Sequence, residues 1–280
     1  MGRTNKGKWA DIPAGQDNPL SFAVTTRDRA TLDMVREAIS HKQVRLAYQP
    51  IVDARLQTSV AFYEGLIRVL DETGRIIPAG QFINAIENTE TGRLMDCLAL
   101  EFGLKTLATQ PAIRMSVNMS ARSIGYGRWM NTLRRGLKRS KTVGERLILE
   151  ITETSAMMMP ELVTEFMDEF QGEGVAFALD NFGAGFTSFS FLKDFYFDIL
   201  KVDGQFTRNI RSNPDNQVLT DAMVRMGRGF DMFTVAQGVE ASEDAAFLTS
   251  LGFDCMQGYL FGAPSITPPW TDARGKTAVA

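Results

Sequence analysis

Histidine is almost absent from this sequence, because the 280 residues include only one, His41. It stands between Ser40 and Lys42 in a polar stretch that looks like the end of a helix. Histidine-rich metal sites and Ser-His-Asp triads therefore cannot be built here unless His41 carries the whole mechanism. A histidine at an exposed helix end is far more often inert than catalytic.

Cysteine is nearly as scarce. Cys97 and Cys255 are far apart in the sequence and form no paired spacing of the metal-binding or redox kind. We therefore interpret both as free, buried thiols.

Long apolar runs are also missing. No stretch approaches the roughly 18 apolar residues that a membrane span needs. The first 20 residues lack the apolar core of a signal peptide. The sequence therefore predicts a soluble, non-exported protein, and hence a cytoplasmic one.

An excess of positive charge is missing as well, since the formal net charge is -3. Proteins that bind long nucleic acids neutralise many phosphates with clustered lysine and arginine, so this balance argues against such a partner. A small anionic ligand needs only a few local cations.

With 44% hydrophobic and 22% charged residues, the composition is that of an ordinary globular protein. Residues 1–25 show no apolar period and read as a tail or linker, and a helix is predicted over 26–42. We expect one domain over 26–270 and a C-terminal tail over 271–280.

Short β-like runs alternate with helical segments along that domain. Eight runs suggest a closed barrel, and amphipathic segments at 91–109, 160–172, 214–229 and 242–251 are long enough for crossover helices. The link between the first two runs, Asp53 to Val60, is too short for a parallel crossover. The predicted fold is therefore an α/β, TIM-like (β/α)8 barrel with the first strand antiparallel. The runs are 46–52, 61–69, 113–118, 146–151, 175–180, 198–202, 233–237 and 255–260.

Each run carries a polar residue in an otherwise apolar stretch, and parallel barrels gather chemistry at the C-terminal ends of their strands. For any one of them, a hydrogen-bonded core residue explains the position equally well. Eight together indicate a site. Buried together, Glu64, Glu150 and Asp180 would require a cation. The set is Gln49, Glu64, Asn118, Glu150, Asp180 with Asn181, Lys201, Gln237 and Gln257.

The donors are oxygen atoms only, from carboxylates and the amide of Asn118. Hard divalent ions such as Mg²⁺ or Mn²⁺ prefer these ligands, whereas Zn²⁺ usually recruits histidine or cysteine. A metal flanked by Lys201 and Arg68 suits a phosphate ester. The residues alone therefore predict metal-dependent phosphodiester chemistry at a barrel mouth.

The order of the motifs adds a family resemblance over residues 46–264. Any one match would be weak, but eight in register resemble the EAL domains, which are cyclic-di-GMP phosphodiesterases and their degenerate receptor members. The motifs are Tyr48-Gln49-Pro50-Ile51-Val52, Glu64-Gly65-Leu66-Ile67-Arg68, Val117-Asn118-Met119-Ser120, Leu149-Glu150-Ile151-Thr152-Glu153, Asp180-Asn181-Phe182-Gly183-Ala184-Gly185, Leu200-Lys201-Val202-Asp203, Ala236-Gln237-Gly238-Val239-Glu240 and Gln257-Gly258-Tyr259-Leu260-Phe261.

This resemblance implies roles for individual residues. Lys201 matches the lysine that contacts the attacking water and the scissile phosphate region. Glu153 matches the glutamate that pins the loop 182–188. The matches to the nucleotide pocket are Gln49, Leu66, Arg68 and Gln257. The matches to the first metal are Glu64, Asn118, Glu150 and Asp180, of which Asp180 also bridges to a second metal.

Two positions depart from the family pattern. Asn181 and Gln237 stand where the family usually has an aspartate and a glutamate, and both matched residues serve the second metal. The glutamate is also a candidate general base, which an amide cannot replace. We therefore expect one well-held Mg²⁺ or Mn²⁺ and a second that is weak or absent. Because a general base contributes about 10² to 10⁴ in rate, this weighs against efficient hydrolysis. Glu240 or a shifted water could partly substitute.

Three functions remain open. The chain is a cyclic-di-GMP receptor or strongly impaired phosphodiesterase, an active enzyme that opens cyclic-di-GMP to linear pGpG, or a scaffold that has lost the nucleotide. The retained pocket residues argue against the scaffold. The aromatic segment from Phe186 to Phe197 corresponds to a region that contributes to dimerisation in EAL relatives, so a homodimer is a further expectation.

Overall fold

Eight strands close into a barrel in the computed structural model, which describes residues 19–140, 142–185 and 189–270. The order around the ring is β1-β9-β8-β7-β6-β5-β4-β2, and β2 pairs back with β1. β1 is antiparallel to both of its neighbours, whereas the other neighbours in the described ring are parallel. The α/β, TIM-like barrel with an antiparallel first strand is therefore confirmed.

The strands and helices agree closely with the expected segments. The strands are β1 (Val44–Asp53), β2 (Val60–Leu70), β3 (Ile76–Pro78), β4 (Met115–Met119), β5 (Leu147–Thr152), β6 (Ala176–Phe182), β7 (Ile199–Val202), β8 (Phe233–Ala236) and β9 (Cys255–Gln257). The α-helices are α1 (Pro19–Ser40), α2 (Ile83–Ile86), α3 (Glu90–Thr109), α4 (Gly127–Arg139), α5 (Glu153–Met158), α6 (Pro160–Gln171), α7 (Gly204–Thr207), α8 (Pro214–Gly229) and α9 (Ser242–Leu251). Short 3-10 turns are η1 (Ala79–Gln81), η2 (Ala121–Ser123), η3 (Gly144–Arg146), η4 (Phe189–Asp194) and η5 (Ile210–Ser212).

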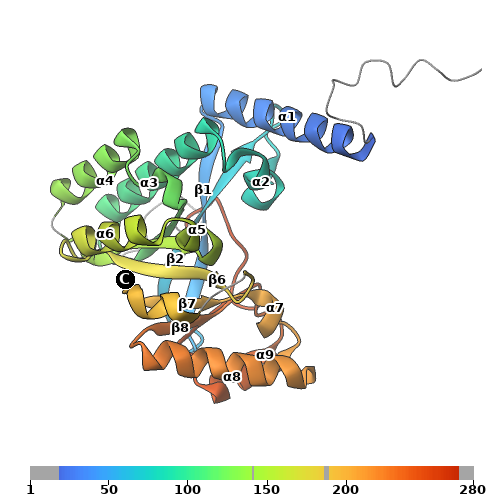
Figure 1. Ribbon diagram of the computed structural model, residues 1–280, viewed down its shortest axis with the longest axis vertical. Coiled ribbons are helices and arrows are strands. Elements are labelled where there is room, and N and C mark those ends of the chain that lie inside the picture. Colours follow the sequence, from blue (N-terminus) through green and yellow to red (C-terminus); the bar gives the residue numbers. More distant parts are fainter. Residues whose placement is uncertain (1–18, 141, 186–188, 271–280) are drawn as a thin grey trace, which may run out of the picture.

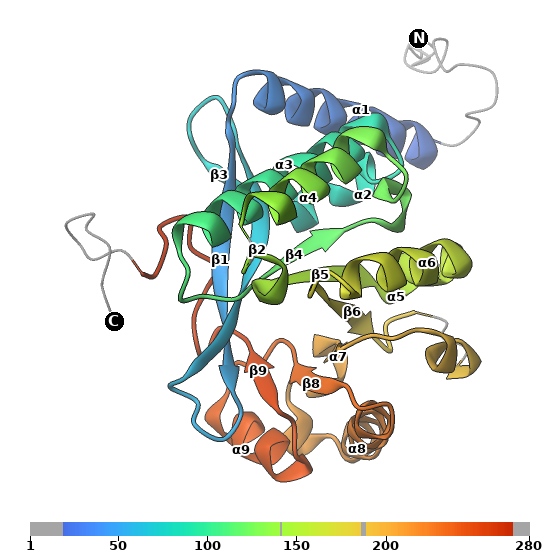
Figure 2. The ribbon, with the colours of Figure 1, turned by 90° about the vertical axis from the view of Figure 1, so that its left-hand side faces the viewer.

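The helices surround the barrel, with α1 and α2 at one end of the molecule and α8 and α9 at the other (Figure 1). Turned by 90°, the long strands β1 and β2 run through the molecule, and α3 and α4 lie beside them (Figure 2). Within the described part of the chain, no helix is both long enough and apolar enough to cross a membrane.

Three local differences from the expected segments stand out. The first helix begins at Pro19, so residues 19–25, which we assigned to a tail, are helical. Proline suits a first helical position, but the β-branched Val24, Thr25 and Thr26 are weak helix formers and hide the start. The short β3 and the helices α2, α4, α5 and α7 lie outside the segments named from the sequence. The last strand ends at Gln257, because residues 258–260 turn away.

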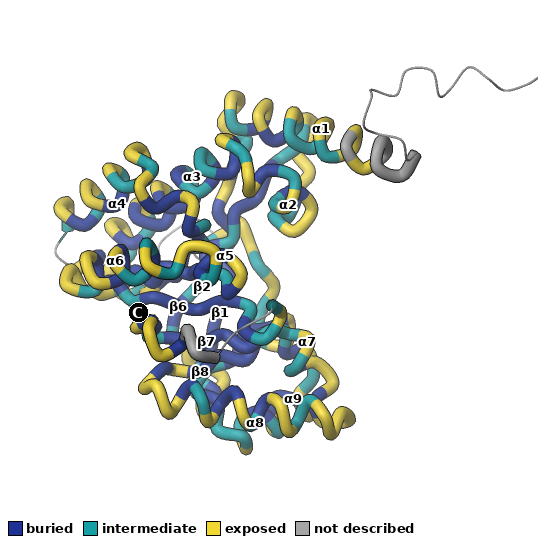
Figure 3. Tube along the Cα trace, in the orientation of Figure 1, coloured by how far each residue is buried: buried dark blue, intermediate teal, exposed yellow. Residues whose placement is uncertain are grey.

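An apolar layer fills the barrel below the site. Side chains alternate along each strand, so one residue in two points inward. The burial map shows these strands as the buried centre of the molecule, with exposed residues on the outer faces of the helices (Figure 3). The inward-facing apolar residues are Ile51, Phe62, Ile148, Ala178, Ile199 and Val235. This layer forms a rigid floor for whatever lies above it.

Arg146, just before β5, caps the end of α3. Its guanidinium donates to the carbonyl oxygens of Leu107 and Gln110 at 2.9 Å each, and of Ile113 at 3.1 Å. These carbonyls lie at or beyond the last turn of the helix, where no intrahelical donor remains. Since α3 also forms one wall of the site described below, this side chain helps to hold that wall on the barrel.

We expect Arg146→Ala to lower the free energy of unfolding by about 2 to 3 kcal/mol, because charged hydrogen bonds contribute about 1.5 to 3 kcal/mol each and water replaces part of the loss. Urea denaturation measures the change. Arg135→Ala is the matched control, since its exposed guanidinium donates only to Asn131 O of its own helix. Equal stabilities of the two variants would contradict the capping role.

Candidate active site

A polar layer lies directly above the apolar layer. Six of the strands carry a polar residue two positions away from one of the inward-facing apolar residues; on β8 this polar residue lies one position past the strand end. Because side chains alternate along a strand, these polar residues also point into the barrel. The pairs are Gln49 with Ile51, Glu64 with Phe62, Glu150 with Ile148, Asp180 with Ala178, Lys201 with Ile199 and Gln237 with Val235. The strand register also sets Gln49 opposite Glu64, and Asn118 opposite Glu150.

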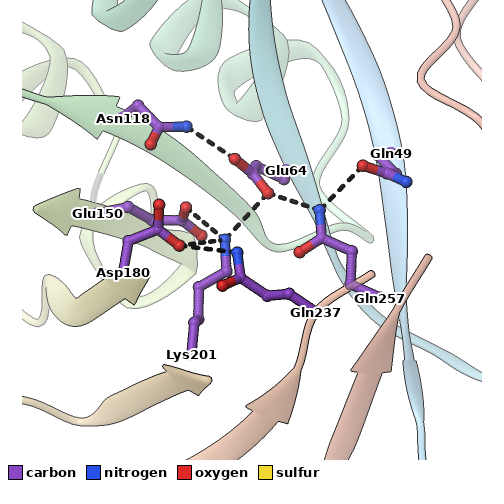
Figure 4. Close-up of polar contacts among 8 residues, drawn as sticks. All are labelled: Gln49, Glu64, Asn118, Glu150, Asp180, Lys201, Gln237 and Gln257. Carbon is purple, nitrogen blue, oxygen red and sulfur yellow. Dashed lines mark hydrogen bonds and ion pairs between the residues drawn. The ribbon is translucent and has the colours of Figure 1, made fainter. Parts of the chain in front are cut away.

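Lys201 is the centre of this layer. Its ammonium group lies 2.6 Å from Glu150 Oε2, 3.0 Å from Glu64 Oε2 and 3.2 Å from Asp180 Oδ1. Figure 4 shows it pointing up between these three carboxylates. The side chains of Lys201 and Glu150 are fully buried. The cation required by the buried carboxylates is therefore present in the chain itself, and Lys201 lies at their centre where we had expected it to flank a metal.

Amide groups complete the surroundings of Glu64. Asn118 Nδ2 donates to Glu64 Oε1 at 2.8 Å, and Gln257 Nε2 donates to Glu64 Oε2 at 2.6 Å. Gln257 Nε2 also lies 3.0 Å from Gln49 Oε1, and Gln49 Nε2 donates to Gly262 O at 3.0 Å. A continuous chain of polar contacts thus joins β1, β9, β2 and β4 above the barrel floor.

Of the two positions that depart from the family pattern, Gln237 contacts Asp180 directly, at the same oxygen atom that Lys201 approaches. Gln237 Nε2 donates to Asp180 Oδ1 at 3.0 Å (Figure 4). Its own Oε1 is buried and has no partner among the described atoms. Asn181 adopts a left-handed backbone conformation with φ 55°, which asparagine tolerates better than most residues. The amide of Gln237 therefore donates a hydrogen bond to Asp180 from a position where a second metal ion would need a negatively charged ligand.

The buried charges shift one another's pKa values. Burial lowers the pKa of Lys201, but the carboxylates outweigh it and hold that pKa well above the usual range. Burial raises the pKa of Glu150 to about 8, with the charge of Glu64 adding to the effect. Burial likewise raises the pKa of Asp180. Burial also opposes the charge of Glu64, yet Lys201 and the two amide donors keep its pKa below the usual value. Lys201 and Glu64 form the firmly charged pair, and Glu150 readily holds a proton.

A cavity of about 700 Å³ opens above the polar layer. This is the size of a pocket for a small organic ligand. The predicted residues that line it are Gln49, Glu64, Leu66, Asn118, Asp180, Asn181, Gln237 and Gln257. Four others are buried away from the lining, namely Arg68, Glu150, Glu153 and Lys201. Arg68 donates to Ile67 O at 2.9 Å and lies near enough to Glu64 to feel its charge, so its role as a nucleotide contact stays a prediction.

Glu153 lies at the start of α5 against the loop that follows β6. Its Oε2 accepts a hydrogen bond from Gly183 N at 2.8 Å. Gly183 has φ 91°, a backbone conformation that favours glycine. Glu153 thus contacts the first residues after β6, and its role in pinning the whole loop stays a prediction because residues 186–188 lie outside the described part of the chain.

The sequence reasoning missed several lining residues. Asp96 on α3 accepts from Ser120 N at 3.0 Å and from Ser123 Oγ at 2.6 Å, and burial raises its pKa to about 6. An acidic residue among the apolar neighbours of that helix was a usable signal. Arg208 and Glu240 form an ion pair of 3.3 Å on the wall near β8. No pattern in the sequence brings these two together.

The side chains of the polar layer are of the kind that a hard divalent ion prefers. Three carboxylates and the amide of Asn118 supply oxygen atoms, and Glu150 Oε1 is buried without a hydrogen-bond partner. The carboxylates nevertheless converge on Lys201, and across the described ranges no three His, Cys, Asp or Glu side chains form a ready metal site. The amide of Gln237, which points a donor at Asp180, does not fit a second ion.

Comparison with known families decides the relationship. The family model described as EAL domain matches residues 32–264. The chain belongs to the EAL domain family. The match covers the whole ring of strands, from β1 to β9, and with it all twelve predicted site residues.

Named relatives of this EAL domain include cyclic di-GMP phosphodiesterases. The cyclic di-GMP phosphodiesterase PdeF of Escherichia coli K12 is 30% identical over 84% of this chain and 32% of that protein. An uncharacterized protein of Synechocystis, sll1895, is 30% identical over 82% of this chain and 34% of that protein. The chain thus spans about a third of the length of the curated relatives it matches.

Solved structures of the family match the fold. The cyclic di-GMP complex of the phosphodiesterase PaMucR has a TM-score of 0.73 at 29% identity, covering 84% of this chain and 97% of that one. The manganese and cyclic di-GMP complex of Klebsiella pneumoniae BlrP1 has a TM-score of 0.69 at 25% identity, covering 80% and 56%. Members of this family have therefore been captured with the dinucleotide, and one of them also with a divalent ion.

The aromatic segment after β6 is only partly described. Phe195 and Phe197 are buried, with ring centroids 5.3 Å apart, whereas Tyr196 is exposed. Core packing therefore accounts for these two phenylalanines. The expected homodimer stays a prediction.

We expect Lys201→Met to lower the free energy of unfolding by about 3 to 5 kcal/mol at pH 8, because it leaves buried carboxylates without their cation. Without the lysine, the carboxylates have higher pKa values in the folded state than in the unfolded state, so the variant loses stability as pH rises through the interval between those two values. The stability difference between the variant and the unmodified chain therefore shrinks toward pH 5. Urea denaturation in EDTA at both pH values measures this. Lys105→Met, at an exposed position of α3, is the control. A pH-independent deficit would contradict the charge argument.

Proposed function

We propose that this EAL domain binds cyclic-di-GMP and acts as a receptor or a strongly impaired phosphodiesterase. One observation carries the proposal, namely the hydrogen bond from Gln237 Nε2 to Asp180 Oδ1 at 3.0 Å. A glutamate at position 237 would repel Asp180 unless a cation separated them. The amide instead satisfies Asp180 directly, so the second metal is not needed to balance this side of the site.

The loss of charge bears on catalysis more than on binding. An ion held between carboxylates would polarise the scissile phosphate and lower the pKa of the attacking water, and Asn181 and Gln237 weaken its hold. Gln237 also cannot accept a proton as a general base. The cavity lining keeps Gln49, Leu66 and Gln257, which match nucleotide-binding positions in the family. These features support a domain that keeps its ligand and loses most of its turnover.

The residues matched to the first metal support binding of cyclic-di-GMP together with one divalent ion. Glu64, Asn118, Glu150 and Asp180 would hold Mg²⁺ or Mn²⁺, with Glu150 Oε1 as a buried oxygen that has no hydrogen-bond partner. Lys201 already neutralises part of this charge, so we propose that ligand binding does not depend strictly on the ion. A tightly held second ion is not part of the proposal.

The alternative is an active phosphodiesterase that hydrolyses cyclic-di-GMP to linear pGpG. The observation in its favour is that Lys201, which the resemblance assigns to the attacking water, lies within 3.2 Å of all three first-site carboxylates. Water or Glu240 would then have to serve where Asn181 and Gln237 do not.

Binding and turnover separate these functions in one experiment. We expect calorimetry to show cyclic-di-GMP binding both with Mn²⁺ and in EDTA. Chromatography should show linear product forming more slowly than about 0.1 s⁻¹. This rate is a hundredfold below an ordinary turnover number of about 10 s⁻¹. Cyclic-di-AMP is the control ligand. No binding would overturn both functions, and turnover near the ordinary rate would establish the alternative.

The double reversion Asn181→Asp with Gln237→Glu should raise hydrolysis at least about a hundredfold, whereas each single reversion does much less. The two carboxylates act on one ion and one water, so their effects are strongly non-additive. Manganese anomalous scattering should show one strong site per chain before the reversion and two after it. The single variants are the matched controls, since each is nearly isosteric. A double variant that binds both ions and the ligand yet stays inert would contradict the explanation.

A further inference from the structure

The cavity is electrically unsuited to an anionic ligand unless specific cations compensate. Its lining includes the carboxylates of Glu64, Glu87, Asp96, Asp180, Asp203 and Glu240, but only the guanidinium groups of Arg93, Arg122 and Arg208. Lys201 is fully buried beneath the lining and is already surrounded by carboxylates. A ligand with two phosphate charges therefore depends on these three arginines or on a bound ion.

Arg208 is built into the wall beside Gln237. Thr207, at the end of α7, donates its hydroxyl to Gln237 O. Gly238 follows with φ 68°, and a Cβ there would lie only 3.0 Å from Arg208 Nε and 3.2 Å from Gly204 Cα. The guanidinium of Arg208 thus lies against the backbone of Gly238, next to Gln237.

The present partner of Arg208 is weakly bound. Arg208 Nε lies 3.3 Å from Glu240 Oε1, and the two side chains are 58% and 54% exposed. Ion pairs this exposed contribute little, because water screens both charges. A phosphate offers the guanidinium paired hydrogen bonds of matching geometry, which Glu240 does not provide here at a single 3.3 Å contact.

The other two arginines are less well placed. Arg93 is paired with Glu90 at 3.0 Å and lies over the ring of Tyr126, on the α3 wall. Arg122 belongs to η2, which follows β4. Of the three cavity arginines described, Arg208 is the one in contact with the residues that directly follow β8, next to Gln237.

We propose that Arg208 contacts a phosphate group of the bound dinucleotide and exchanges Glu240 for it, supplying positive charge on the side of the cavity where Gln237 stands. This inference rests on the proposed function. It makes Glu240 a competitor of the ligand, so removal of its charge should help binding.

Calorimetry with cyclic-di-GMP in EDTA tests the exchange. We expect Arg208→Ala to weaken binding by about tenfold or more, which corresponds to the loss of one charged hydrogen bond. Glu240→Gln should bind as tightly as the unmodified chain, or several-fold more tightly. The weakening by Arg208→Ala should also shrink as salt is raised, because salt screens the charge. Arg225→Ala is the control, since Arg225 forms an exposed pair with Asp221 on α8.

The outcomes distinguish this inference from the proposed function. If the unmodified chain and Arg225→Ala fail to bind cyclic-di-GMP, the proposed function itself falls. If both bind and Arg208→Ala binds equally well, only the phosphate contact is refuted. If Arg208→Ala and Glu240→Gln weaken binding alike, the pair merely holds the wall in place and the exchange is refuted. Weaker binding by Arg208→Ala together with equal or tighter binding by Glu240→Gln establishes it.

Discussion

One ammonium group between three buried carboxylates is the constraint on which the site depends. Burying that much negative charge is costly unless a cation compensates, and Lys201 supplies one from within the barrel. The amides of Asn118 and Gln257 satisfy the oxygens of Glu64 that remain. The result is a polar layer that is stable over an apolar floor. Burial and the neighbouring charge of Glu64 nevertheless raise the pKa of Glu150 to about 8, against the opposing effect of Lys201.

The replacement of two carboxylates by amides follows the same electrostatics. The amide of Gln237 donates to Asp180. A glutamate at the same position would repel Asp180 in the absence of a cation. At Asn181 the left-handed backbone accepts asparagine without strain beyond what the loop already requires. Both side chains line the cavity, whose described lining has more carboxylates than guanidinium groups.

Much of the fold was predictable because two simple periodicities are strong in this chain. The short link from Asp53 to Val60 is sufficient to make the first two strands antiparallel, and the register confirms it. The alternation along the strands also predicted which polar residues share the barrel interior. The start of α1 at Pro19 was missed because its first turns contain β-branched residues, whose helix propensity is low. Asp96 was missed although it stands among apolar neighbours on α3, because that signal alone does not say which pocket the side chain joins.

The sequence by itself determined the barrel, its reversed strand, the family and the residues of the polar layer, because each depends on local spacing and on motif order. Only the tertiary structure decided what those residues do to one another. It placed Lys201 at the centre of the carboxylates, set Gln237 against Asp180 and brought Arg208 over Gly238 beside Glu240. These contacts join strands and loops that are distant in sequence, and the pKa values and pairings arise from distances of a few ångströms that no linear pattern specifies.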